Sequence, residues 1–273
     1  MTRILVTGAS GFIGSAVVRR LARDGHDWVA FQGDLLSADQ PDLSSVKATH
    51  CLHTAWYTNH SDYLTHDINS GWAAASLRLA NEFSRAGGQR FLGLGTCLEY
   101  DVAIADGPCS EDRTPLLPDT LYARSKLALF DGLKQCGGNF AWARIFFVYG
   151  PGDRDGRLVP HMIEGFARGE KAGPSYGGLR RDYIHVDDLA GQLVRIALSD
   201  VQGAINTGTG QAPTLSELFA AGAMAFGRPD LALANEETGE QPPLIQADMS
   251  RFRREVGELQ ARNIATGFRD LVA

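Results

Sequence analysis

Short apolar runs alternate with stretches of helical spacing along the first half of the chain. A β-branched run at residues 3–7 leads directly into a glycine-rich turn, and apolar side chains then recur at helical spacing from Ile13 to Ala22. After a break at Gly25, a second apolar run occupies residues 28–31. A strand, a helix and a second strand joined by such short links predict a βαβ unit with parallel strands and a right-handed crossover.

The same alternation continues to about residue 150. Apolar runs lie at 50–55, 91–95 and 141–148, and helical spacing fills 72–83 and 121–133 between them. Alternating strands and helices are typical of α/β proteins, so we expect a doubly wound parallel sheet.

The pattern loosens in the second half of the chain. A turn-rich break at residues 151–156 follows Gly150, and a later helix opens with the capping box that begins at Thr214. No repeat or low-complexity tract separates the halves. We therefore expect a sheet domain over 1–150 and a smaller lobe over 151–273, with chain exchange between the two.

The charge balance bears on the possible partners. The 273 residues include 26 Lys and Arg against 32 Asp and Glu, which gives a formal net charge of −6. A protein that binds a nucleic-acid backbone usually carries a basic surplus, so we expect no nucleic-acid partner. No apolar run approaches the roughly 18 residues that cross a bilayer, so we expect no membrane partner either.

The cysteines and the N-terminus favour a cytoplasmic location. Cys51, Cys97, Cys109 and Cys136 are scattered, without a histidine cluster at metal-ligand spacing. The apolar run at the N-terminus breaks too early for the core of a signal peptide. We therefore expect free thiols in a reducing compartment, no metal site and a soluble cytoplasmic enzyme.

Three glycines, Gly8, Gly11 and Gly14, lie between the first predicted strand and helix. In such a turn the first glycine allows the bend, the second lets phosphate oxygens approach the backbone, and the third lets the helix pack closely on the sheet. The helix N-terminus adds free N–H donors and a partial positive charge. With its strand and helix in place, the motif predicts a dinucleotide pyrophosphate site.

The end of the second predicted strand bears on the choice between NAD and NADP. An acidic residue there would hold the adenosine ribose 2′-hydroxyl, whereas this chain has Gln32 followed by Gly33 and Asp34. A neutral amide does not repel a 2′-phosphate, and no arginine clamp follows. Both cofactors therefore remain possible, and Asp34 is either a cofactor contact or a solvated turn residue.

Tyr122 and Lys126 share one face of a predicted helix that Asp119 or Thr120 can cap. A phenol has a pKa of about 10, and a nearby cation lowers that pKa towards the working range. The pair also suits an ordinary amphipathic helix, but together with the glycine turn it predicts proton transfer. Thr96 ends a predicted strand, where it either binds the reacting oxygen or caps a turn.

These motifs resemble the extended short-chain dehydrogenase/reductase family, in its NAD-dependent epimerase/dehydratase branch, which acts on nucleotide sugars. The matches follow the family's order over nearly the whole chain. The matching segments are residues 7–15, 52–55 with Asn69, Thr96 with Tyr100, Tyr122 with Lys126, 149–151, 181–188 and 206–210.

The resemblance implies NAD or NADP on an N-terminal Rossmann domain and a nucleoside-diphosphate sugar beneath the smaller lobe. Tyr122 would exchange a proton with the sugar, Lys126 would bind the nicotinamide ribose and lower the Tyr122 pKa, and Thr96 would orient the substrate. The implied cofactor contacts are Gly8, Ser10, Gly11, Phe12, Ile13, Gly14, Gln32, Asp34, Leu35, Thr54, Ala55, Trp56, Asn69, Tyr122, Lys126 and Phe146. The implied substrate contacts are Thr96, Phe147, Arg157 and Arg181. Family dimers pair the helices that correspond to 72–86 and 120–135, so a homodimer is expected.

Departures from the family pattern favour a reductase. Only residues 32–49 separate the second and third predicted strands, a shortening that is similar to the 4-ketoreductases that complete deoxysugars. Cys97 and Leu98 stand where 4,6-dehydratases carry an acid and a base after the threonine. Leu98 and Arg157 replace the Cys and His of the C3/C5 epimerase-reductases, and Phe147 replaces an expected Asn.

We therefore expect a 4-ketoreductase of deoxysugar biosynthesis that acts on an NDP-4-keto-6-deoxyhexose. The alternative is an NDP-sugar 4-epimerase with tightly bound NAD, because the same catalytic residues serve both reactions. A second alternative is a non-catalytic dinucleotide-sensing protein, since a fold by itself does not fix a function.

Overall fold

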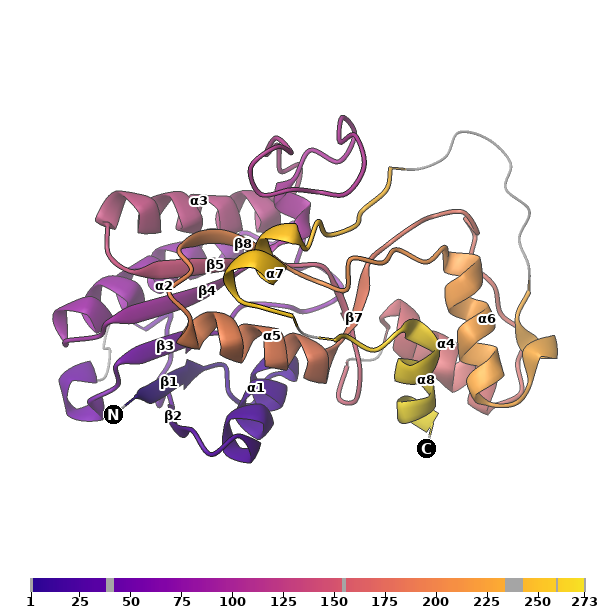
Figure 1. The fold of residues 1–273 in the computed structure, drawn as a ribbon, viewed down its shortest axis with the longest axis horizontal. Coiled ribbons are helices and arrows are strands. Elements are labelled where there is room, and N and C mark those ends of the chain that lie inside the picture. Colours follow the sequence, from indigo (N-terminus) through magenta and orange to yellow (C-terminus); the bar gives the residue numbers. More distant parts are fainter. Residues whose placement is uncertain (1, 38–41, 154–155, 234–242, 259, 273) are drawn as a thin grey trace.

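The computed structural model describes residues 2–37, 42–153, 156–233, 243–258 and 260–272 (Figure 1). Its centre is a six-stranded sheet in the order β2-β1-β3-β4-β5-β8, and every pairing is parallel. The strands are β1 (Arg3–Thr7), β2 (Asp27–Ala30), β3 (His50–His53), β4 (Arg90–Thr96), β5 (Phe140–Ile145) and β8 (Gly203–Thr207). This confirms the predicted α/β fold with a doubly wound parallel sheet.

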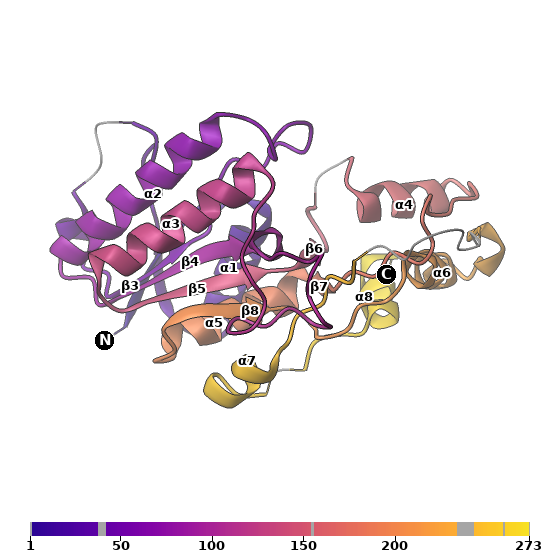
Figure 2. The same ribbon diagram turned by 90° about the horizontal axis from the view of Figure 1, so that it is seen from above.

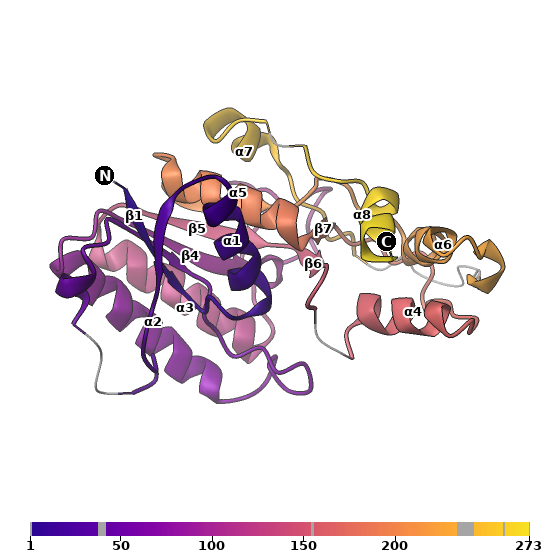
Figure 3. The same cartoon turned by 90° about the horizontal axis from the view of Figure 1, so that it is seen from below.

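Two helical layers cover the sheet. Helices α2 (Ile68–Arg85) and α3 (Leu121–Cys136) lie side by side on one face, and α1 (Phe12–Arg23) and α5 (Val186–Leu198) lie on the other (Figures 2 and 3). Successive side chains of a strand point to opposite faces. Ile4 accordingly packs with the α1 and α5 layer, whereas Leu5 packs with the α2 and α3 layer.

The second half of the chain contributes both to the large sheet and to a separate group of helices. After β6 (Phe147–Tyr149) and β7 (Tyr183–His185), which form a separate two-stranded sheet, α5 and β8 return to the large sheet. Helices α4 (Leu158–Ala167), α6 (Leu215–Ala225) and α8 (Ile264–Val272) gather at one end of the molecule (Figure 1). They share their own apolar core around Phe166, Leu218 and Phe268. The division into domains at residue 150 remains a prediction.

Short elements complete the described structure. These are the 3-10 turns η1 (Leu43–Val46), η2 (Cys97–Glu99) and η3 (Pro229–Leu231) and the helix α7 (Ser250–Glu255), which packs beside β8. Within the described residues, η1 is the only regular element between β2 and β3. The expected turn at 151–156 lies partly outside the described residues.

In the part of the chain that the structure describes, no helix has the length and apolar character needed to cross a membrane. The same residues contain no group of three His, Cys, Asp or Glu side chains that could hold a metal ion. Cys51, Cys97 and Cys109 are buried free thiols, and Cys136 is exposed.

Candidate active site

The glycine turn brings β1 and α1 into very close contact. Gly8 has a φ of +65°, and a Cβ on Gly14 would lie only 2.0 Å from the Gly8 carbonyl oxygen. The Gly11 N–H donates to the same oxygen at 2.9 Å. Side chains at Gly8 and Gly14 would therefore force the turn open.

A cavity of about 300 Å³ lies along this turn. Gly11 is the N-cap of α1, no side chain caps the helix, and its first turn has no acidic residue. The free N–H groups therefore fit an anionic pyrophosphate. The lining residues are Gly8, Ser10, Gly11, Phe12, Ile13, Gly14, Thr54, Ala55, Trp56, Thr58, Trp72, Val148, Asp153 and Arg157. The structure thus brings most of the expected cofactor residues together.

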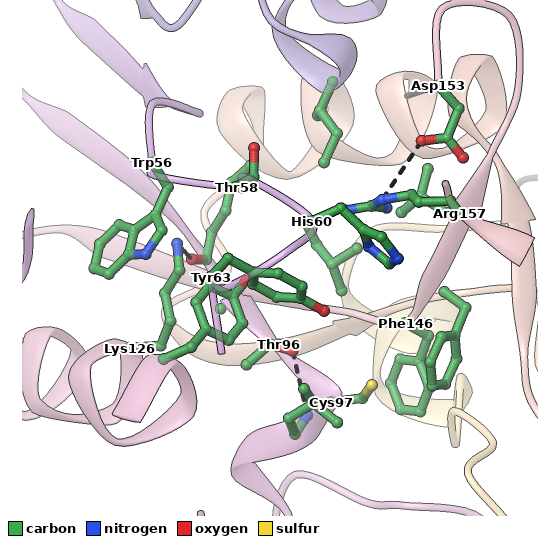
Figure 4. A pocket seen from close by; sticks show the side chains of 18 of the residues that line it. Trp56, Thr58, His60, Tyr63, Thr96, Cys97, Lys126, Phe146, Asp153 and Arg157 are labelled. Carbon is green, nitrogen blue, oxygen red and sulfur yellow. Dashed lines mark hydrogen bonds and ion pairs between the residues drawn. The ribbon is translucent and has the colours of Figure 1, made fainter. Parts of the chain in front are cut away.

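A second cavity, of about 350 Å³, lies at the carboxyl end of β4 (Figure 4). It contains the three expected catalytic residues Thr96, Tyr122 and Lys126. It also contains Phe146, expected at the cofactor, and Phe147 and Arg157, expected at the substrate. The two cavities adjoin, because Ile13, Thr54, Trp56, Thr58, Val148, Asp153 and Arg157 line both.

Lys126 is held in place by two groups. Its Nζ donates to the Leu94 carbonyl oxygen at 2.8 Å and lies 3.6 Å from the centre of the Trp56 ring. Figure 4 shows Trp56 and Lys126 side by side at one end of the cavity, with the Asp153–Arg157 ion pair at the other end. Burial lowers the pKa of Lys126 to about 7, and the negative charge of Glu99 opposes this decrease.

Tyr122 lies on the first turn of α3, which Thr120 caps by accepting the Ala123 N–H at 3.2 Å. The Tyr63 ring packs edge-on against Tyr122 at 5.2 Å between ring centres. Burial raises the pKa of Tyr122, and Tyr63 and Glu99 raise it further. Arg157 opposes this increase, and the expected lowering of the Tyr122 pKa by Lys126 remains a prediction.

Thr96 caps a turn and also faces a cavity, while its binding of the reacting oxygen remains a prediction. Its Oγ1 accepts the Leu98 N–H at 3.3 Å and so caps η2, and the residue also lines the catalytic cavity. Thr96 lies there because it is the last residue of β4. Ligands of open α/β sheets bind at the carboxyl ends of the strands.

The comparison with protein families agrees with this geometry. A model described as the NAD dependent epimerase/dehydratase family matches residues 4–208. The chain belongs to this family. The match confirms the resemblance drawn from the motifs, and with it the nicotinamide cofactor class of the family.

Individual members of the family are distant relatives of this chain. UDP-glucuronic acid decarboxylase 1 of Xenopus tropicalis is 25% identical over 240 residues, a match that covers 77% of this chain and 56% of the decarboxylase. The chain thus spans little more than half the length of that relative. ADP-L-glycero-D-manno-heptose-6-epimerase of Alkalilimnicola ehrlichii is 25% identical over 316 residues, covering 98% of this chain and 95% of the epimerase.

A solved structure shares the fold over the whole chain. The NAD dependent-NDP-hexosamine 5,6-dehydratase TunA superposes with a TM-score of 0.84 at 22% identity, covering 100% of this chain and 97% of TunA. At this identity the likeness concerns the fold alone.

Four residues expected at the family's cofactor lie outside both cavities. Gln32 and Asp34 are exposed just beyond β2, where the Asp34 carboxylate accepts the Leu36 N–H at 2.9 Å. Leu35 is buried, and its carbonyl oxygen accepts from Arg78 at 2.8 Å. A cofactor contact of these three residues remains a prediction.

Asn69, the fourth, is fully buried and binds the chain between β3 and α2. Its Nδ2 donates to the Tyr63 and His66 carbonyl oxygens at 2.7 and 2.8 Å, and its Oδ1 accepts from Trp56 at 2.9 Å. Asn69 therefore fixes the loop that covers Tyr122. Its contact with the cofactor remains a prediction.

Arg181, one of the four expected substrate contacts, is a described residue that lines neither of these two cavities. Its Nη1 donates to the Arg180 and Pro243 carbonyl oxygens at 2.8 and 2.6 Å. The guanidinium carbon lies 5.9 Å from the centre of the Phe147 ring, which does line the catalytic cavity.

Two kinds of residue near the site were not predicted from the sequence. Thr58, His60 and Tyr63 line the catalytic cavity from the loop between β3 and α2. The signal for them in the sequence was the run of polar and aromatic residues that directly follows the 52–55 motif. Glu99 was also not predicted, because its contact with Arg144 depends on the position of β5 in the sheet.

Proposed function

We propose that this chain is a nucleotide-sugar 4-ketoreductase that converts the 4-keto group of an NDP-4-keto-6-deoxyhexose to a hydroxyl. The observation that carries the proposal is the shared wall of the two cavities. It sets Thr96, Tyr122 and Lys126 beside a glycine turn suited to a dinucleotide.

Each catalytic side chain has a separate task in this reaction. The glycine turn would hold a reduced nicotinamide cofactor, which would supply the hydride for the new C–H bond at C4 and be oxidised. The Tyr122 hydroxyl donates its proton to the sugar oxygen, so the C=O group becomes CH–OH and Tyr122 becomes a phenolate. The Lys126 ammonium stabilises that phenolate, and the Thr96 hydroxyl orients the same oxygen.

The residues beside Thr96 support a reductase over a dehydratase. Loss of water from the sugar needs an additional acid and base, whereas Cys97 and Leu98 occupy the cavity wall at this point. Burial raises the pKa of the Cys97 thiol, so this side chain is a poor base near neutral pH.

The first experiment determines whether the cofactor is consumed. The purified chain is scanned near 340 nm, its bound nucleotide is identified, and NADPH or NADH is added with a panel of NDP-4-keto-6-deoxysugars. Stoichiometric loss of reduced cofactor is expected with at least one sugar. Tightly bound NAD and interconversion of sugar isomers without net cofactor use would instead identify a 4-epimerase, and dinucleotide binding without turnover would identify a sensor.

We further propose a homodimer in the cytoplasm. Helices α2 and α3 pack side by side on the outer face of the sheet, where they would form a four-helix contact with a second copy (Figure 2). Light scattering is expected to give twice the 29.5 kDa of the chain. The free thiols suit a reducing compartment.

A further inference from the structure

A buried ion pair lies directly behind the catalytic cavity. The Arg144 Nε and Glu99 Oε2 atoms are 2.8 Å apart, and the two side chains are 1% and 0% exposed. Neither residue lines the cavity. Taking both charges out of water is costly, so the pair calls for a structural or functional explanation.

The β4 strand provides the space for this pair. A Cβ on Gly95 would lie 2.6 Å from Glu99 Oε1 and 2.2 Å from the Trp142 indole nitrogen. A Cβ on Gly93 would lie 2.6 Å from the Trp142 ring. Glu99 and Trp142 therefore occupy room that exists only because β4 has glycine at both positions.

The contacts of Glu99 favour its ionised form. Its carboxylate accepts from the Thr96 N–H at 3.0 Å, from the Trp142 indole at 3.1 and 3.2 Å, and from Arg144. Burial raises the pKa of Glu99, and these donors oppose that increase. Every partner is a donor, so none can accept the proton of a neutral carboxylic acid.

The pair reaches the catalytic groups from two sides. Glu99 holds the backbone of Thr96, and Arg144 lies 5.5 Å from the ring of Phe130. Phe130 follows Tyr122 and Lys126 at intervals of one helical turn, so all three share one face of α3. Arg144 is anchored in turn, since its Nη1 donates to the Tyr100 hydroxyl at 3.1 Å.

We propose that Glu99, held by Arg144, is a positioning residue of the active site that fixes Thr96 and sets the electrostatic potential behind Tyr122 and Lys126. The inference rests on the proposed function, because it assigns Glu99 to that reaction. Glu99 contacts neither substrate nor cofactor and acts through the three catalytic residues.

The direction of the electrostatic effect follows from the sign of the charge. A carboxylate opposes formation of the Tyr122 phenolate and favours the Lys126 ammonium, so Glu99 raises the pKa of both groups. The other groups that face Tyr122 are Tyr63, Cys97, Arg157 and Lys126. All of them remain unchanged when Glu99 is replaced.

The test compares two substitutions that separate charge from contact. Glu99→Gln keeps an oxygen for the Thr96 N–H but removes the charge. The alkaline limb of the pH profile of kcat/KM should therefore move to lower pH by about one unit, because the reaction needs a charged Lys126 and a protonated Tyr122 and removing the carboxylate lowers both pKa values. Glu99→Asp keeps the charge on a shorter side chain, so kcat should fall about 10-fold while the limb and KM stay in place.

Arg90→Gln is the matched control. Arg90 is also buried in β4, but at the opposite end of the strand, where it donates to the Ile196, Ala197 and Val201 carbonyl oxygens. Its substitution should lower the melting temperature without moving the limb. If Glu99→Gln leaves the limb in place, or Arg90→Gln moves it equally, the inference is wrong.

Two further measurements cover the remaining outcomes. If Glu99→Gln does not fold, the double variant Glu99→Gln/Arg144→Gln leaves no unpaired charge and should still move the limb to lower pH; an unmoved limb overturns the inference. If the wild-type chain reduces no sugar, the proposed function fails and unfolding replaces kinetics. The stability difference between wild type and Lys126→Met should begin to rise at about pH 7, the pKa of Lys126 in the folded chain, and this onset should move to lower pH in the Glu99→Gln background. An unchanged onset contradicts the electrostatic role.

Discussion

At the scale of single residues, Tyr122 and Lys126 are buried groups whose pKa values reflect lost hydration. Burial raises the pKa of the phenol and lowers that of the ammonium, so both effects favour the neutral forms. Proton transfer to a sugar uses a neutral phenol and a charged lysine. Burial therefore holds Tyr122 in the neutral form that the proposed reductase would require.

Tyr122→Phe tests the proton donor. The phenyl ring keeps its packing against Tyr63 and loses the proton, so turnover should fall at least ~100-fold while cofactor affinity changes little. Reduction assays and cofactor titration measure the two quantities. Tyr176→Phe, at a residue that is 68% exposed, serves as the control. Retained turnover in Tyr122→Phe would place the proton donor elsewhere.

Lys126→Met tests how the buried ammonium changes the free energy of unfolding with pH. The pKa of Lys126 is about 7 in the folded chain, below its ordinary value, so the unfolded state binds more protons between about pH 7 and pH 10. The stability of wild type relative to the variant should therefore rise by about 1.4 kcal/mol per pH unit over this range and stay constant below it. Urea unfolding at several pH values measures the slope. Lys134→Met, on the same helix but with a side chain that is 58% exposed, is the control, and an equal slope there would contradict the prediction.

At the scale of elements, the contact between β1 and α1 depends on the absence of two side chains. The Gly8 oxygen and the Thr54 hydroxyl would lie 2.0 and 2.8 Å from a Cβ on Gly14, so the helix can approach the sheet only with glycine here. The same approach aims the N-terminus of α1 into the cavity along the glycine turn.

Gly14→Ala should open the turn and weaken dinucleotide binding at least 10-fold, with a stability loss of about 1–3 kcal/mol. Titration with NADH and NADPH and urea unfolding test both effects. Gly71→Ala, in α2, is the matched control, because its Cβ would meet only Leu36 at 3.9 Å. That variant should gain up to about 1 kcal/mol from helix propensity. Equal cofactor binding by both variants would argue against the pyrophosphate site.

At the scale of the whole molecule, one carboxylate ties together segments that are distant in sequence. Asp182, just before β7, is fully buried and accepts from the Thr209 N–H and hydroxyl, the Gly210 N–H and the Ala247 N–H at 2.9, 2.6, 2.9 and 3.2 Å. Burial raises the pKa of Asp182, and these donors oppose the increase. It thereby holds the chain beyond β8 and the segment before α7 against the small sheet.

Asp182→Ala leaves these buried donors without a partner and should destabilise the fold by about 3–5 kcal/mol. Urea unfolding followed by far-UV circular dichroism measures the loss. Asp230→Ala, which breaks the exposed Arg228–Asp230 pair, should leave the unfolding midpoint unchanged. Similar midpoints for the two variants would show that Asp182 does not hold these segments in place.

The sequence by itself determined the features that are local in the chain. The glycine turn spans Gly8 to Gly14, and Tyr122 and Lys126 lie one helical turn apart, so spacing alone fixes their geometry once the elements form. The order of strands and helices determined the parallel sheet. The carboxyl end of a parallel strand predicted that Thr96 would lie where ligands bind, and Thr96 does line a cavity at this edge of the sheet.

Only the tertiary structure decided which distant residues meet. Glu99 and Arg144 belong to η2 and β5, and they pair because β5 lies beside β4 in the sheet. Arg181 donates to the carbonyl oxygen of Pro243, which lies 62 positions further along the chain, a contact that no local spacing encodes. Such contacts depend on strand order and on side-chain packing between layers, so they can be seen only once the whole chain has folded.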